Sequence, residues 1–232
     1  MKHLSILFVI FFGHFLVAQN VILNKVERSH SNTDKTFYKI NPAETKAEYL
    51  GEIEVQGFSD DDAEMFGKVY KKAKQIGANA FAYKPFESVT GGQQKFDAAH
   101  YRLSLYYVEQ ADLRPETNIV YLISSPYRDQ IISFNDEKIA FKPRTFIRKT
   151  LVPGTVYTVS TRKFLGSSIK LSAQENQPVQ YFQFSAFSVN SNPYGTSGIN
   201  LKSGDITRLE QSYAQFLTTI YQSLDSLEEQ QK

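Results

Sequence analysis

The sequence predicts an α+β protein with an N-terminal β-α-β-β domain, a C-terminal antiparallel β-sandwich and a long C-terminal amphipathic helix. Three observations predict this class. Residues 50–83 read as strand, helix and strand, residues 118–189 contain short apolar runs separated by turn residues, and residues 205–227 repeat apolar side chains at spacings of three and four. With 232 residues, 41% of them hydrophobic, the chain can bury a sizeable core.

The β-α-β-β domain is expected over residues 47–108. Its first strand, near residues 50–56, alternates polar and apolar side chains with the period of two that a half-buried strand shows. Ser59 is expected to cap the following helix, with the acids of residues 60–62 near its positive end. Gly77 stands where a left-handed C-terminal cap is expected, and strands at residues 80–83 and 98–108 follow. The helix stripe is Ala63, Phe66, Val69, Tyr70, Ala73 and Ile76.

Two polar segments flank this domain. Residues 20–46 contain an Asn41-Pro42 pair and show no sustained period, which predicts a tether or a loose first strand. Residues 109–117, with the sequence EQADLRPET, carry three acids and a proline between apolar runs, which is typical of a linker between domains.

The β-sandwich is expected over residues 118–189, where turn signals such as Asn135-Asp136 and Pro153-Gly154 separate short apolar runs. In the last run, Phe182, Phe184 and Ala186 are predicted to face the core, with Tyr181 and Gln183 on the other face. The expected strands are residues 119–123, 130–134, 138–141, 145–151, 155–160, 168–172 and 179–189.

The last part of the chain is expected to be a loop, 190–204, and a helix, 205–227. The loop is rich in Gly, Asn and Ser and carries an isolated aromatic residue, Tyr194, which is a candidate ligand contact. Asp205 is expected to cap the helix. Packing of its apolar stripe on the chain's own sheet predicts a monomer, and a partial heptad pattern leaves coiled-coil self-association open. The stripe is Ile206, Leu209, Tyr213, Phe216, Leu217, Ile220, Leu224 and Leu227.

Residues 1–19 match a secretory signal peptide, with Lys2 followed by an apolar run that ends in Ala18-Gln19. The end of this segment resembles the leaders of Bacteroidota bacteria. Export is therefore expected, to the periplasm, the outer membrane or the exterior. The chain has no cysteine, so it has neither a lipid-anchor motif nor disulfides nor a thiol nucleophile.

Two stretches resemble known bacterial modules. The run from Lys72 to Phe81, following residues 51–55, resembles small β-α-β units of a family of pentameric domains described as heavy-metal-binding, and the sensory domain of Rcs-type envelope stress lipoproteins. The resemblance covers residues 47–108 and implies a fold without a ligand set. Residues 118–189, with a Pro153-Gly154 turn and aromatic residues opening the last strand, are similar to envelope β-sandwich modules of unknown function.

The residues of common catalytic and metal sites are scarce. Outside the leader the only histidines are His30 and His100, and neither a Gly-x-Ser-x-Gly motif nor a paired-histidine zinc site is present. The acids of residues 60–62 and Glu64 could offer oxygens to calcium, but they lack the spacing of a calcium loop, and helix capping accounts for them. No catalytic residue, metal or cofactor is predicted.

Charge is separated along the chain, although the formal net charge is only +2 and implies no nucleic-acid partner. Residues 47–67 contain seven acids and no Lys or Arg, and residues 138–170 contain eight Lys or Arg and no acid. The two domains could face each other through these segments, the basic segment could bind an anionic partner, or the charges could be scattered over the surface. The candidate anion-binding residues are Lys142, Arg144, Arg148, Lys149, Arg162 and Lys163.

The function expected from these observations is that of an exported, non-enzymatic binding or assembly module of the cell envelope. Its partner would be an envelope protein, a polysaccharide or an anionic lipid. The alternative is an exported hydrolase with a carboxylate-based site.

Overall fold

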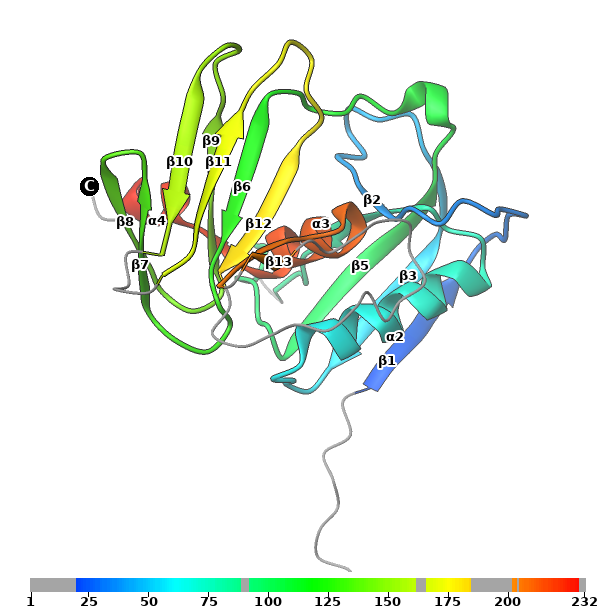
Figure 1. Cartoon of the computed structure of the whole chain (residues 1–232). Helices are drawn as coiled ribbons and strands as arrows, with labels where there is room; N and C mark the ends of the chain where they lie inside the picture. Colours follow the sequence, from blue (N-terminus) through cyan, green and yellow to red (C-terminus); the bar gives the residue numbers. More distant parts are fainter. Residues whose placement is uncertain (1–19, 89–91, 162–165, 185–201, 204, 230–232) are drawn as a thin grey trace, which may run out of the picture.

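The described part of the chain forms three β-sheets. The computed structural model describes residues 20–88, 92–161, 166–184, 202–203 and 205–229. Its sheets have the strand orders β1-β3-β5-β4-β2, β11-β10-β7-β8 and β13-β14-β12-β6-β9-β15 (Figure 1). None of the helices in these residues is long and apolar enough to cross a membrane.

The five-stranded sheet contains the predicted β-α-β-β unit. In this unit β3, α2 and β4 follow one another, and β5 lies between β3 and β4, antiparallel to both. Residues 20–46 supply the two edge strands rather than a free tether, because β1 pairs with β3 and β2 pairs with β4. The elements are β1 (Asn20–Val26), β2 (Tyr38–Lys39), β3 (Glu48–Gln56), α2 (Asp62–Gln75), β4 (Ala80–Lys84) and β5 (His100–Tyr107).

The two ends of α2 are held by local contacts. Asp61, not Ser59, is the N-cap, and its carboxylate accepts hydrogen bonds from the backbone N–H groups of Ala63 and Glu64 at 3.0 and 2.8 Å. This leaves Asp62, the next residue, free for another contact. At the other end Gly77 has a φ of +76°, which confirms the predicted left-handed conformation.

The four-stranded and six-stranded sheets pack face to face as a sandwich, and a strand lies in each of the seven expected ranges, although residues 185–189 of the last range lie outside the described residues. Their core includes Leu122, Phe141, Val159 and Phe184. The sandwich is not wholly antiparallel, because β12 is parallel to β6 and β15 (Gln222–Ser223) is parallel to β9. The seven strands are β6 (Ile119–Ile123), β7 (Gln130–Phe134), β8 (Glu137–Phe141), β9 (Thr145–Thr150), β10 (Val156–Ser160), β11 (Ser168–Ser172) and β12 (Gln180–Phe184).

Both faces of the six-stranded sheet are covered. Phe182 and Phe184 face the sandwich core, as predicted, whereas Tyr181 belongs to a second core shared with the five-stranded sheet. Gln183 is also buried. Ala186 lies outside the described residues. This sheet is therefore the middle layer of the molecule.

The prediction of one long helix over residues 205–227 is wrong. The chain there forms β14 (Ile206–Arg208), α3 (Gln211–Ile220), β15 and α4 (Leu224–Glu229), with β13 (Lys202–Ser203) beside β14. Strand pairing overrides the amphipathic pattern, because Ile206 pairs with Phe184 and the N–H of Gln222 donates to the Arg144 carbonyl at 3.0 Å. Glu210, not Asp205, caps α3 through the N–H groups of Ser212 and Tyr213.

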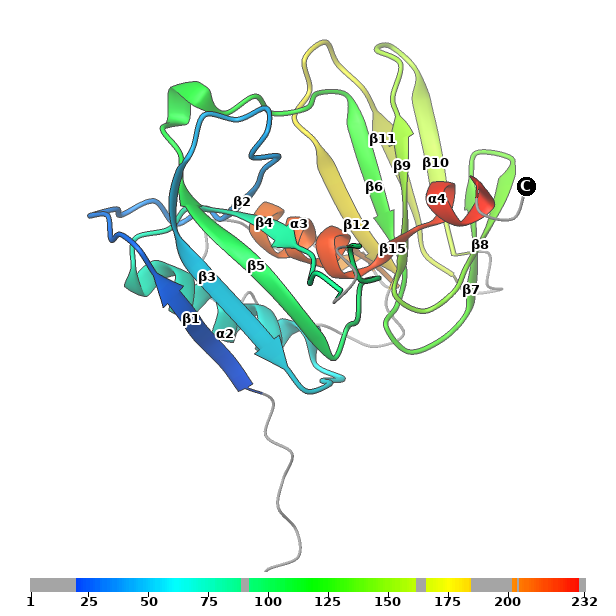
Figure 2. The ribbon, with the colours of Figure 1, turned by 180° about the vertical axis from the view of Figure 1, so that it is seen from behind.

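The helix α3 joins the two predicted domains into one packed body. It lies between the five-stranded and six-stranded sheets (Figure 2). Phe216 shares a core with Phe66, with ring centroids 5.5 Å apart, and the Ser212 hydroxyl accepts from the N–H of Phe37 at 3.0 Å. The side chains that could have formed a coiled-coil stripe are thus largely buried inside the chain.

Replacing Gly77 by alanine is expected to lower the free energy of unfolding by roughly 3 kcal/mol or more. A Cβ there would lie 1.8 Å from the His30 carbonyl oxygen, in addition to the strain of the positive φ. Gly154 is the matched control, because its φ is +81° but a Cβ would meet nothing within 4 Å. The Gly154→Ala variant should lose only about 1 kcal/mol in urea unfolding. Equal losses would contradict a close approach at Gly77.

Candidate functional site

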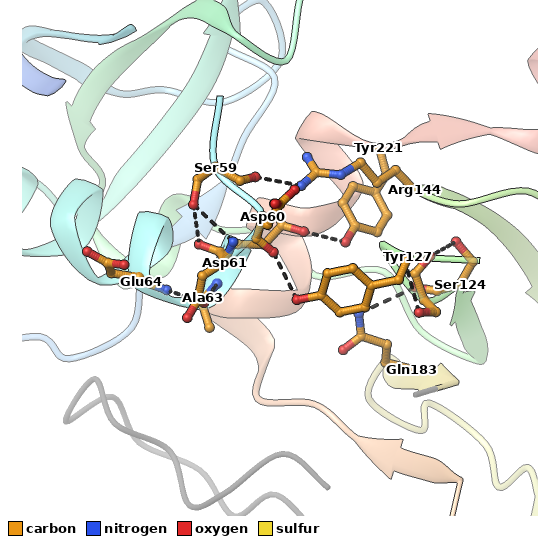
Figure 3. Close-up of polar contacts among 12 residues, drawn as sticks. Ser59, Asp60, Asp61, Ala63, Glu64, Ser124, Tyr127, Arg144, Gln183 and Tyr221 are labelled. Atoms are coloured by element: carbon orange, nitrogen blue, oxygen red, sulfur yellow. Dashed lines mark hydrogen bonds and ion pairs between the residues drawn. The ribbon is translucent and has the colours of Figure 1, made fainter. Parts of the chain in front are cut away.

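Four segments from both halves of the molecule meet at one end of α3. They are the loop that leads into α2, the loop after β6, the residue before β9 and the residue after α3 (Figure 3). We call this place the seam. It is the point where the acidic and basic segments of the sequence come into contact.

An ion pair between the buried Asp62 and the partly buried Arg144, together with a tyrosine, lies at the centre of the seam. The Arg144 Nη2 atom lies 3.0 Å from Asp62 Oδ1 and donates to the Ser59 carbonyl at 2.8 Å. The Tyr221 hydroxyl donates to the other Asp62 oxygen at 2.6 Å. Asp62 is only 5% exposed. The contacts therefore tie α2, β9 and the end of α3 together in a place that water hardly reaches.

The electrostatics of this network follow from its burial. Burial raises the pKa of Asp62, and the Arg144 charge and the Tyr221 hydrogen bond act against that rise. Burial also raises the pKa of Tyr101, and the negative charge of Asp62 adds to this rise. The Tyr101 hydroxyl has no hydrogen-bond partner among the described residues. Arg144 has a φ of +56°, a conformation that non-glycine residues rarely adopt. The ion pair and the Ser59 contact hold it there.

Two exposed aromatic rings lie on the outside of this network. Phe58 is 55% exposed and Tyr127 is 63% exposed. The Arg144 guanidinium lies 4.8 Å from the centre of the Phe58 ring, and the Tyr127 hydroxyl donates to the Asp60 carbonyl at 3.0 Å. One ring comes from each half of the molecule. Such a pair can stack on an apolar or sugar surface.

The four predicted basic residues that the structure describes do not gather on one surface. Arg144 faces Asp62 in the seam, Arg148 pairs with Glu116 at 2.9 Å, and Lys149 pairs with Glu137 at 2.9 Å. Lys142 is exposed between β8 and β9. Arg162, Lys163 and Tyr194 lie outside the described residues. Anion binding by this set stays a prediction, and an anion at Arg148 or Lys149 would compete with a carboxylate of the chain.

Two carboxylates of β3, those of Glu52 and Glu54, are bound by cationic or hydrogen-bonding side chains. Glu52 is 3% exposed and contacts Lys84 and Arg102. Hydrogen bonds from Gln56 and His100 lower the pKa of Glu54. A catalytic acid needs a raised pKa, so the lowered pKa of Glu54 is that of a carboxylate in a structural network.

His30, for which a structural role is expected, makes a contact within the fold. His30 stacks on Tyr107 with ring centroids 3.6 Å apart. In the part of the chain that the structure describes, no three His, Asp or Glu side chains converge as metal ligands.

Sequence reasoning missed Asp62 as a member of the seam, because its acidic neighbours made it look like part of a helix cap. It also missed Phe58 and Tyr127, which lie in short loops. A weak signal was present, since both loops combine an aromatic residue with several charged or polar ones.

Replacing Arg144 by methionine is expected to lower the free energy of unfolding by about 3 kcal/mol, because Asp62 would remain buried without its cation. The Asp62→Asn variant should also be destabilised. The double variant should lose at least about 1 kcal/mol less than the sum of the single losses. Urea unfolding of the four proteins measures this coupling, and simple additivity would contradict the ion pair.

The loss of unfolding free energy caused by Arg144→Met should depend on pH. A carboxyl whose folded pKa lies above its unfolded pKa contributes stability below the unfolded pKa and loses it as the pH rises through the folded pKa. Removal of Arg144 raises the pKa of Asp62 further, since this cation lowers it in the native protein. The loss should therefore be larger at pH 8 than at pH 5. A loss that does not change with pH would show that Asp62 does not titrate in the variant.

Comparisons of the chain with protein-family models, with curated proteins and with solved structures return no match. The resemblances of residues 47–108 and 118–189 to envelope modules stay predictions. The geometry of the seam is what supports a function.

Proposed function

We propose that the protein is an exported, non-enzymatic binding module of the bacterial cell envelope, and that it binds an envelope polysaccharide at the seam. The binding face is formed by Phe58, Tyr127, Asp60 and Asp61, and we call it the seam surface. The proposal is carried by one observation: two aromatic side chains from separate halves of the molecule are more than half exposed beside the ion pair of Arg144 with the buried Asp62.

Contacts with neighbouring groups hold both rings of the seam surface in place. Tyr127 is held at both ends, because its N–H donates to the Ser125 hydroxyl at 3.2 Å and its own hydroxyl donates to the Asp60 carbonyl at 3.0 Å. Phe58 packs against the Arg144 guanidinium. A pre-organised ring loses little conformational entropy when a ligand binds, so exposed rings of this kind are suited to recognition.

The charge around the rings favours a sugar over an anionic lipid. Asp60 and Asp61 are exposed beside Tyr127, and together with Asp62 their charges add to the rise in the pKa of the tyrosine that burial causes. These carboxylates would repel a phosphate headgroup but can accept hydrogen bonds from sugar hydroxyls. The positive charge of Arg144 is already paired with Asp62.

Export and envelope location are part of the proposal and rest on the signal-peptide pattern of residues 1–19. The hydrolase alternative has less support, because Glu52 and Glu54 are bound by cationic or hydrogen-bonding side chains. The hydrogen bonds that lower the pKa of Glu54 oppose a role for it as a proton donor at neutral pH.

Replacing Phe58 or Tyr127 by alanine should weaken polysaccharide binding by about tenfold or more, because each change removes one stacking surface. Purified peptidoglycan and soluble envelope polysaccharide are incubated with the protein, and the bound fraction is measured by sedimentation and by titration calorimetry. The matched control is Ile131→Ala, since Ile131 is 59% exposed but lies on the sandwich, in β7.

The control variant should bind as the native protein does. The proposal fails if the native protein binds none of these polysaccharides, or if neither aromatic substitution weakens binding. Binding to vesicles of anionic phospholipid, with no binding to sugar polymers, would identify a lipid surface as the partner and would also overturn it.

A further inference from the structure

A second polar cluster lies where β2, the segment of residues 109–117 and the six-stranded sheet come together. Glu116 is at its centre. Arg148 Nε and Nη2 donate to one oxygen of Glu116 at 3.2 and 2.9 Å, and the Tyr121 hydroxyl donates to the other oxygen at 2.9 Å. Both oxygens of one carboxylate are therefore held by donors from two neighbouring strands.

Lys39 adds a second positive charge to this cluster. Its ammonium donates to the Thr218 carbonyl at 3.0 Å. Although the residue as a whole is exposed, burial of the ammonium lowers the pKa of Lys39 to about 8, and the Glu116 charge opposes this shift. Lys39 is thus mostly protonated at pH 7 and attracts the same carboxylate that Arg148 and Tyr121 bind.

The donors lie on paired strands, whereas the carboxylate does not, although the Arg148 side chain is 43% exposed. Tyr121 and Arg148 are paired across β6 and β9, and the Tyr121 ring stacks on the buried Tyr181 ring with centroids 5.3 Å apart. Glu116 comes instead from an irregular segment, and its side chain is 46% exposed. The site could keep its donors if this side chain moved away.

We propose that Arg148 and Tyr121, with Lys39 as a further positive charge nearby, form a carboxylate-binding site that Glu116 occupies in the free protein, and that the carboxylate of a sugar acid displaces it. An arginine with two donors on a carboxylate is a common means of recognising carboxylates. The partly buried Tyr121 ring offers a surface for the sugar ring beside the charge. This site is separate from the seam surface and does not depend on the function proposed for it.

The competing interpretation is that Glu116 only ties its segment to the six-stranded sheet. The two interpretations predict opposite results for Glu116→Gln. If Glu116 blocks a binding site, its neutral variant should bind an external carboxylate more tightly, since the competing charge is gone. If Glu116 only anchors its segment to the six-stranded sheet, the variant should gain no affinity for an external carboxylate.

Digalacturonate is titrated into the native protein and the Glu116→Gln, Arg148→Met and Lys149→Met variants, with acetate and a neutral disaccharide as comparison ligands. The Glu116→Gln variant should bind digalacturonate at least tenfold more tightly than the native protein. Arg148→Met should abolish binding, also when combined with Glu116→Gln. Lys149→Met is the matched control, because Lys149 forms a similar ion pair with Glu137 at 2.9 Å, and it should bind as the native protein does.

Three results would overturn the proposal. They are a Glu116→Gln variant that binds no more tightly than the native protein, a double variant that still binds, and a loss of affinity in Lys149→Met equal to that in Arg148→Met. Equal affinity for acetate and digalacturonate would reject the sugar acid as the ligand class. Thermal unfolding of each variant, with polysaccharide binding at the seam surface as a second readout, distinguishes local loss of the site from loss of the fold.

Discussion

The burial of α3 between the five-stranded and six-stranded sheets is the contact on which the rest of the structure depends. Phe216 and Leu217 from this helix share a core with Phe66 of α2, so two sheets that are remote in sequence lose water from their facing surfaces together. Tyr221 follows directly after α3 and reaches Asp62. The ion pair at the seam is therefore set in place by apolar packing, and the packing supplies most of the stability that keeps its charges buried.

The same packing explains why both candidate sites lie between the two halves. The seam surface combines Phe58 from the loop before α2 with Tyr127 from the loop after β6. The carboxylate cluster combines Lys39 from β2 with Arg148 from β9. Neither half alone presents either set of side chains. A ligand at the seam should thus bind only the folded protein and stabilise the contact between the halves.

Local patterns in the sequence predicted the local structure well. The strands from β6 to β11 were expected within a residue or two, because turn residues delimit each apolar run. The left-handed conformation of Gly77 was expected because a helix ends there. The prediction of one helix over residues 205–227 was wrong. An amphipathic pattern cannot reveal that Ile206 and Gln222 pair with strands of the six-stranded sheet. Periodicity reports which residues are buried, and a buried strand next to a helix can show the same apolar spacing.

The candidate sites were harder to predict because charge along a chain does not determine charge on a surface. Arg148 and Lys149 are neighbours in sequence, yet successive side chains of a strand point to opposite faces. Arg148 accordingly meets Glu116, whereas Lys149 meets Glu137 and lies 6.0 Å from the centre of the Phe134 ring. Arg144, four residues before Arg148, forms an ion pair with Asp62 in the other half of the molecule. A one-signed stretch on a β-strand is thus divided among several partners, and each partner is selected by the tertiary fold.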